Sequence, residues 1–155
     1  MYLLKTKYGN IGIEANSKGI SKLVLNPKLS KKQANNPTDK NLKRLLSLLK
    51  DYFSGKKVDF SVELDIAQYP IFYQKVWQLV RKIPYGKTMT YSDVARKIGN
   101  PKAYRAVGQA LKANPLPIVI PCHRVVKKDK SLGGFAGGLR WKQRLLEIEG
   151  NMIKN

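Results

Sequence analysis

The hydrophobic pattern of this 155-residue chain changes near Tyr69, and this change limits the fold more than any other feature. Before it, short apolar runs are separated by glycine-containing turns, which is typical of hairpins. After it, apolar residues recur at intervals of three and four, which is typical of amphipathic helices. We therefore predict an α/β (α+β) fold, with an N-terminal sheet-and-helix domain at residues 1–66 and a largely helical domain at residues 67–155.

The first domain is expected to contain a small meander and one helix. Three strand-like runs occupy residues 3–26 and are broken at the GN and SKG turns. Residues 41–55 place their leucines on one face and end at Gly55, which predicts a helix. Residues 58–67 alternate apolar and polar side chains, so we predict a strand that returns to the sheet.

The second domain contains a helix-turn-helix pattern. A helix is expected to begin near Pro70 and to end before Pro84 and Gly86. Residues 90–115 then predict a helix at 92–98, a GNPK turn, and a second helix at 103–113. The pattern is typical of DNA binding, although helical hairpins that bind no DNA share it.

The charge balance favours a polyanionic partner. Thirty Lys and Arg against ten Asp and Glu give a formal net charge of +20. A folded basic domain is typical of nucleic-acid binding, although many of these lysines can simply be solvated surface. Because no apolar run approaches the length of a membrane-spanning helix, we expect a soluble, intracellular protein without membrane contact.

The only cysteine and the only histidine of the chain, Cys122 and His123, are adjacent in IVIPCHRVV at residues 118–126. One residue of each kind excludes an internal disulfide and most zinc sites, so no metal or cofactor is expected. The pair is either a reactive thiol with its base, or an inert cysteine beside an unrelated histidine.

The neighbourhood of the pair offers further candidate groups. The apolar residues 118–120 predict a buried strand or extended run, and Pro121 predicts a stiff turn at the thiol. A carboxylate would be needed to orient the histidine, and the spacing leaves Glu147 and Glu149 both open. The glycine-rich residues 131–140 can either supply backbone donors to a flat ligand or form a plain flexible loop.

Taken together, these motifs resemble the active-site region of the O6-alkylguanine-DNA alkyltransferases. The resemblance rests on TYSDVARKIGNPKAYRAVGQALKANP, NPLPIVIPCHRV, GGFAGGL and LLEIEG, and it extends from about residue 71 to residue 150. It implies a ribonuclease H-like N-terminal domain and a winged-helix-like C-terminal domain. It also implies a monomer that moves an alkyl group from O6 of guanine in double-stranded DNA onto its own cysteine, once, by flipping the base and without a cofactor.

The resemblance further implies roles for individual residues. Cys122 would be the alkyl acceptor, His123 its water-mediated base, and Glu149 the carboxylate that orients the histidine. Tyr91 would donate a hydrogen bond to guanine N3, and Asn114 would be the hinge between the second helix and the cysteine.

DNA contacts are expected mainly on the second helix of the helix-turn-helix. Arg105 would fill the stack that the flipped base leaves, and small residues such as Ala110 would let the helix lie in the minor groove. The predicted DNA-binding set is Arg105, Tyr91, Ala106, Gly108, Gln109, Lys112 and Arg124.

The pocket for the base is predicted from Val125, Phe135, Ala136, Gly137 and Leu111, with backbone carbonyls near Cys122 and Val125 receiving the exocyclic amine of guanine. Ala136 stands where many relatives have serine, and Phe135 where tyrosine is common. Both residues lack a hydroxyl group that the common residue has. The range of accepted alkyl groups, and activity on O4-alkylthymine, are therefore left open.

Two other functions remain open at this stage, a DNA-binding module that recognises alkyl lesions without repairing them and a cysteine hydrolase that turns over. The compartment is expected to be the cytoplasm, or the nucleus in a eukaryote.

Overall fold

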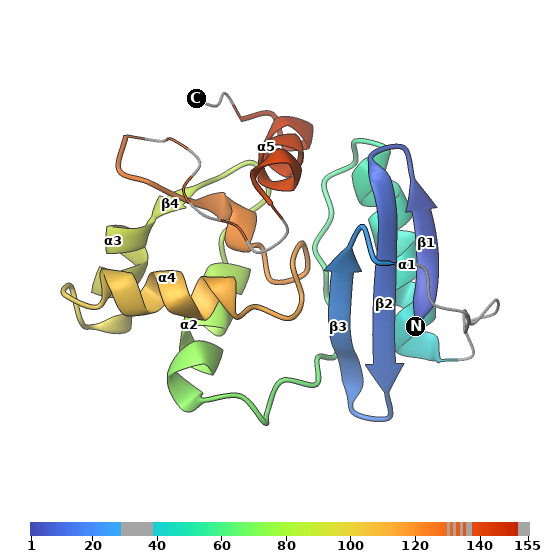
Figure 1. Ribbon diagram of the computed structural model, residues 1–155, viewed down its shortest axis with the longest axis horizontal. Helices are drawn as coiled ribbons and strands as arrows, with labels where there is room; N and C mark the ends of the chain where they lie inside the picture. The colour runs from blue at the N-terminus through green and yellow to red at the C-terminus, as the bar shows by residue number, and fades with distance from the viewer. Residues whose placement is uncertain (29–38, 130, 132, 134, 136–137, 152–155) are drawn as a thin grey trace. The chain divides into compact units, whose positions relative to one another are not determined.

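The computed structural model describes residues 1–28, 39–129, 131, 133, 135 and 138–151. It divides the chain into two units, Met1–Gln68 and Tyr69–Asn155 (Figure 1). The mixed α/β class predicted from the sequence is confirmed.

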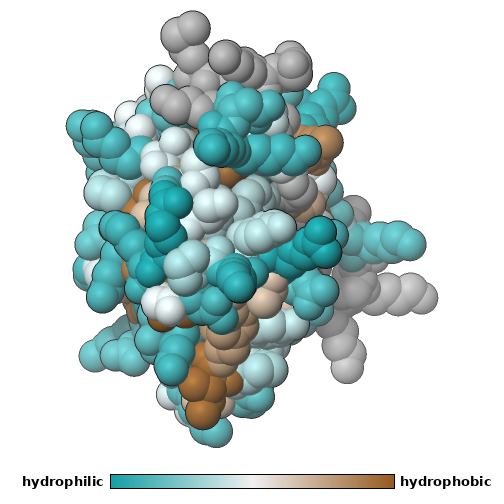
Figure 2. Space-filling view, turned by 90° about the vertical axis from the view of Figure 1, so that its left-hand side faces the viewer, coloured by the Kyte–Doolittle hydropathy of each residue, from teal (hydrophilic) through white to brown (hydrophobic). Residues whose placement is uncertain are grey.

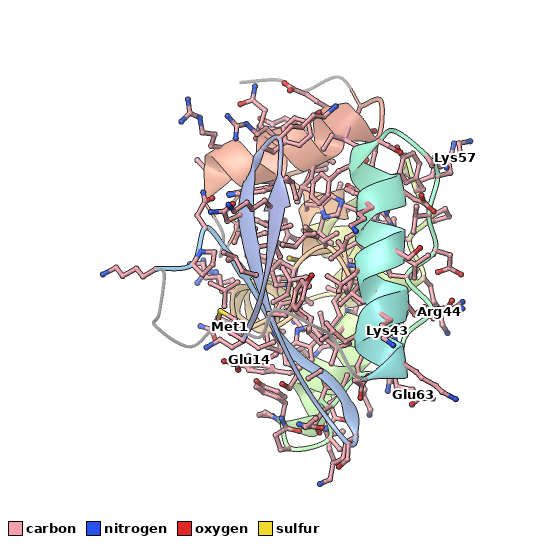
Figure 3. The ribbon with its side chains drawn as sticks, turned by 90° about the vertical axis from the view of Figure 1, so that its right-hand side faces the viewer. Met1, Glu14, Lys43, Arg44, Lys57 and Glu63 are labelled. Carbon is pink, nitrogen blue, oxygen red and sulfur yellow. The ribbon has the colours of Figure 1, made fainter. Side chains whose placement is uncertain are left out.

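The first unit contains the predicted meander. Strands β1 (Tyr2–Thr6), β2 (Gly9–Asn16) and β3 (Gly19–Leu25) form an antiparallel sheet in the order β1-β2-β3. Helix α1 (Lys40–Phe53) begins at Asp39, whose carboxylate accepts a hydrogen bond from the Leu42 amide at 2.9 Å. Figure 3 shows α1 alongside the strands, with Arg44 on the side of the helix that faces away from them.

The core of this unit lies between the sheet and α1. Alternation along β2 buries Ile11 and Ile13, while the helical period buries Leu45 and Leu49 on one face of α1. Burial of each such side chain contributes about 1.5–3 kcal/mol, so the amphipathic pattern is sufficient to hold the helix on the sheet.

The strand predicted at residues 58–67 is wrong. This segment meets β3 at a single parallel bridge between Ile20 and Leu64, flanked by two backbone hydrogen bonds of 2.9 Å. Farther back, the amides of Ser61 and Val62 donate to carbonyls only two residues earlier, so they are not available to a ladder. Gly19 permits the close approach, because a Cβ there would lie 2.6 Å from the Glu63 carbonyl oxygen.

The second unit contains the predicted helices. Helix α2 (Ile71–Arg81) begins after Pro70, and α3 (Tyr91–Ile98) and α4 (Tyr104–Lys112) form the helix-turn-helix. A capping box of Thr90 and Asp93 begins α3, and Gly99 ends it with a φ of 94°. The Trp77 indole donates to the Ala110 carbonyl at 2.8 Å and so ties α2 to α4.

The remaining elements surround the cysteine. The short strands β4 (Met89–Thr90) and β5 (Val125–Val126) pair in parallel, and a 3₁₀ turn, η1 (Cys122–Arg124), precedes β5. Helix α5 (Leu139–Ile148) ends the unit. Within the described ranges, none of the helices has the length and apolar character that crossing a membrane requires.

Residues 118–120 are buried as predicted, but they are not a strand. Pro117 and Ile120 bridge each other across a tight turn, and Ile118 lies inside it with a φ of 75°. A β-branched residue in the left-handed region is strained, so the surrounding hydrogen bonds must hold this turn. Asn114 provides two of them, donating to the Ile120 carbonyl at 2.9 Å and accepting from the Leu116 amide at 2.8 Å.

Candidate active site

Cys122 lies at the first position of η1, directly after the turn that Asn114 holds. Its residue is 4% exposed, and its amide donates to the Ile120 carbonyl at 2.7 Å. Asn114 also hydrogen-bonds the thiol. The predicted hinge asparagine therefore contacts both the strained turn and the cysteine that follows it.

A pocket of about 180 Å³ opens onto the thiol. Its lining brings together residues from the predicted catalytic, DNA-binding and base-binding sets: Tyr91, Gly108, Leu111, Lys112, Cys122 and Phe135. These residues come from α3, α4, η1 and the glycine-rich segment. The pocket is therefore placed between the helix-turn-helix and the cysteine, as a base flipped out of DNA would require.

The thiol is protonated in this setting. Burial raises the pKa of Cys122 to about 11, although the Asn114 hydrogen bond and the charge of Lys142 act in the opposite direction. A neutral thiol is a poor nucleophile, because the thiolate is the reactive form. The site therefore needs a base.

His123, the next residue in η1, is the candidate base. The ring is fully buried, and Nε2 lies 2.6 Å from Oε2 of Glu149. Burial lowers the pKa of His123, so the ring is neutral near pH 7. With the proton on Nε2 donated to the carboxylate, Nδ1 is left as an acceptor, and this atom has no hydrogen-bond partner in the described protein.

Glu149 is held from two directions. Its Oε1 accepts from Arg124 Nε at 2.7 Å and from the Gly86 amide at 3.2 Å, while Oε2 accepts from Arg124 Nη2 at 3.1 Å as well as from His123. Burial opposes ionisation, yet the hydrogen bonds from His123 and Arg124 and the charge of Arg124 lower the pKa of this carboxyl to about 2. Glu149 is therefore a carboxylate throughout the physiological range.

The structure decides between the two carboxylates that spacing left open. Glu149 is 6% exposed and meets His123, whereas Glu147 lies on the exposed side of α5 and accepts from Gln143 at 3.1 Å.

Arg124 requires a correction. It was predicted to contact DNA, but its side chain is 7% exposed and forms the two bonds to Glu149 just described. Its remaining terminal nitrogen donates to the Ile83 carbonyl at 2.7 Å. Because burial and pairing take up the guanidinium, it does not face a groove or a phosphate.

Lys142 is a residue that sequence reasoning missed. It is fully buried, donates to the Val125 carbonyl at 2.7 Å, and places its ammonium 5.8 Å from the centre of the Tyr91 ring. Burial lowers its pKa to about 8. A signal was present in the sequence, since Lys142 and Leu145 on α5 and Glu149 at its C-cap follow one another at helical spacing.

The exposed face of α4 carries most of the predicted DNA contacts. Arg105, Ala106, Gln109 and Lys112 are exposed, and Gly108 is half-buried with open space where a Cβ would be. Ala110 is wrong as a contact, because it is fully buried against Trp77. Hydrophilic side chains cover most of the side of the molecule on which α3 and α4 lie (Figure 2).

The base-binding predictions have mixed outcomes. Leu111 and Phe135 line the pocket, and Val125 is buried on β5. The Val125 carbonyl already accepts from Lys142, so guanine would have to use its second lone pair. Ala136 and Gly137 lie outside the described residues. Across the described ranges, no group of three His, Cys, Asp or Glu is arranged to hold a metal ion.

The sequence of the chain matches the models of a known protein family. Residues 71–151 match the family model described as the DNA-binding domain of 6-O-methylguanine DNA methyltransferase, and residues 1–66 match its ribonuclease-like domain. The chain belongs to the 6-O-methylguanine DNA methyltransferase family. The family resemblance predicted from the motifs is thereby confirmed, and it extends over the N-terminal unit as well.

Individual members of the methyltransferase family agree with this assignment. A methylated-DNA–protein-cysteine methyltransferase of Methanosarcina barkeri is 38% identical over 98% of each chain. The constitutive enzyme of Bacillus subtilis is 48% identical over 70% of this chain and 66% of its own length. Among solved structures, Mycobacterium tuberculosis OGT in complex with DNA has a TM-score of 0.84 and 34% identity, covering 96% of this chain and 91% of that one.

Proposed function

We propose that this member of the family repairs DNA directly, by moving the alkyl group from O6 of guanine in duplex DNA onto Cys122 in a single irreversible turnover. The observation that carries the proposal is the position of the buried thiol, which lies at a pocket lined by α3 and α4 and beside the His123–Glu149 pair. No cofactor takes part, because the thiol itself is the acceptor.

The reaction begins with proton removal. His123 Nδ1 accepts the proton of the Cys122 thiol through a bridging water, and Glu149 stabilises the imidazolium that forms. The thiolate then attacks the alkyl carbon in line, so that the S–C bond forms while the C–O6 bond breaks. The electron pair of the broken bond stays on the guanine, and the Tyr91 hydroxyl donates to N3 as that charge develops.

Access to O6 requires the nucleotide to leave the stack, at a cost of a few kcal/mol. Arg105, exposed on α4, offsets part of this cost by filling the vacated space. Gly108 and Ala106 allow a close approach of α4 to the minor groove. Gln109 and Lys112, on the same exposed side, contact the backbone of the duplex.

We assign this chemistry to a domain of residues 67–155 and treat residues 1–66 as a separate domain. The protein acts as a monomer on duplex DNA, and O4-alkylthymine is a further candidate substrate. Because the reaction needs both DNA and a free thiol, we place it in a reducing compartment, the cytoplasm or the nucleus of a eukaryote.

The test is incubation of the protein with a duplex carrying methyl-labelled O6-methylguanine. We expect label on Cys122, with at most one methyl group per protein molecule. The control is Cys122→Ala, which should bind the same duplex and acquire no label. Repeated turnover would identify a hydrolase, and binding without label in the unaltered protein would identify a lesion-binding module; either result would overturn the proposal.

A further inference from the structure

Arg124 makes contacts beyond its salt bridge to Glu149. Two of its nitrogens reach the two carboxylate oxygens, and the third is fixed on the Ile83 carbonyl of the segment after α2. The guanidinium also lies 5.9 Å from the centre of the Tyr85 ring, and Tyr85 in turn donates to the Ile148 carbonyl at 3.1 Å. The guanidinium is therefore held by the Glu149 carboxylate, the Ile83 carbonyl and the Tyr85 ring.

We propose that Arg124 is a positioning residue that keeps His123 neutral, because it supplies the positive charge that Glu149 would otherwise draw from the imidazole. This inference rests on the proposed function, in which His123 accepts the thiol proton. It deepens that function by naming the residue that sets the protonation state of the base.

The argument is one of charge balance in a buried site. The charged groups that act on His123 are Glu149, Arg124 and Lys142. A carboxylate buried without a cation is costly, so it either takes up a proton or gains a positive neighbour. With Arg124 present, Glu149 is already paired, and the bond from His123 Nε2 can be that of a neutral ring.

Without Arg124, the positive partner nearest the carboxylate would be the histidine itself, 2.6 Å away. His123 would then carry protons on both nitrogens. Nδ1 would donate rather than accept, and it could not take the proton of Cys122. Arg124 therefore determines whether the base is available, although it is not among the described residues that line the pocket.

The sign of the pH effect follows from the contributions to His123. Burial lowers the pKa of His123, Glu149 raises it, and Arg124 and Lys142 lower it further. Removal of Arg124 leaves Glu149 less opposed, so the pKa rises and the neutral fraction falls at any given pH near neutrality. The acid limb of the transfer rate should therefore move to higher pH.

The decisive measurement is nitrogen NMR of protein labelled with ¹⁵N-histidine. His123 is the only histidine, so the spectrum reports this ring alone. In the unaltered protein we expect a neutral ring protonated on Nε2 near pH 7, since burial lowers the pKa of His123. In Arg124→Met we expect the titration midpoint to rise by about 1–3 units, the range typical for a single charge partner.

The control is Arg140→Met, which removes the same charge from an exposed position on α5 and should leave the spectrum unchanged. Arg124→Lys keeps the charge but cannot span both oxygens, so it should retain a mostly neutral ring. The double variant Arg124→Met/Glu149→Gln removes the anion together with the cation, and His123 should again be neutral. A purely structural arginine predicts neither the rescue by lysine nor the return to neutrality.

Equal titration of His123 in Arg124→Met and the unaltered protein would overturn the proposal, as would a shift in Arg124→Lys as large as that in Arg124→Met. If Arg124→Met does not fold, the double variant decides. Its folding would support the charge role, while failure of both would overturn it, because removal of the anion would then not compensate for loss of the cation. These readouts need no DNA, so they are distinguishable from failure of the proposed transfer reaction.

Discussion

Lys142 and Cys122 act on each other's ionisation through the buried interior. The negative charge of a Cys122 thiolate raises the pKa of Lys142, and the Lys142 cation lowers that of Cys122. The ammonium is anchored on the Val125 carbonyl, directly after the turn that holds the cysteine. A fixed cation at this place stabilises the thiolate.

Lys142→Met should therefore slow methyl transfer by about tenfold or more, since each pKa unit of thiolate stabilisation corresponds to about 1.4 kcal/mol. Single-turnover rates should be measured against pH. The part of the profile that reports ionisation of the Cys122 thiol should move to higher pH in the variant. Lys75→Met, at an exposed position of α2, is the matched control and should transfer normally. No change in this part of the profile in Lys142→Met would contradict this role.

At the scale of elements, α4 has one face that packs into the unit and an opposite face that is exposed and available to DNA. Val107, Ala110 and Leu111 are buried against the unit, whereas Arg105, Gln109 and Lys112 are exposed. The spacing of the exposed side chains aligns them along one side of the helix. The same helix can thus contact a duplex while its Leu111 lines the pocket at Cys122.

Arg105→Ala should slow transfer from duplex DNA by about tenfold or more, since stacking in the vacated space is worth about 1–3 kcal/mol. Transfer from the free base O6-benzylguanine should change little, because that substrate leaves no gap to fill. The comparison of the two rates in one preparation is the measurement. Equal slowing of both substrates would place Arg105 in the pocket instead of the DNA stack.

At the scale of the whole molecule, the net charge of +20 predicts strong attraction to any nucleic acid. This attraction is not selective, since phosphate contacts hold no sequence information. Selectivity for the lesion must come from the pocket and from the chemistry at Cys122.

Binding of an undamaged duplex should therefore depend steeply on salt. Each phosphate neutralised contributes about −0.9 to the slope of log K against log salt, and we expect a total slope of about −4 or steeper. Titrations at several salt concentrations, followed by fluorescence anisotropy, would measure it. Lys112→Ala should reduce the slope by about one unit. A flat response would mean that the positive charge serves another purpose.

The sequence by itself determined the elements and the family. Helices and hairpins follow from hydrophobic periods and turn residues that are close in the chain, so the meander, α1 and the helix-turn-helix could be predicted with their approximate bounds. The Cys122–His123 pair was recognisable because both residues are unique. The strand predicted at 58–67 was wrong, since alternation cannot show that the amides of Ser61 and Val62 donate to carbonyls within the segment itself.

Only the tertiary structure decided which charges are buried together. Arg124 and Glu149 are 25 residues apart, and their pairing removed the arginine from the predicted DNA contacts. The packing of α5 on η1 places Glu149, and not Glu147, against His123. It also brings Lys142 into the site, where it bonds the Val125 carbonyl. The physical reason is that a charge next to an apolar residue in sequence can be solvated or buried. Its partner across the fold decides which state has the lower free energy.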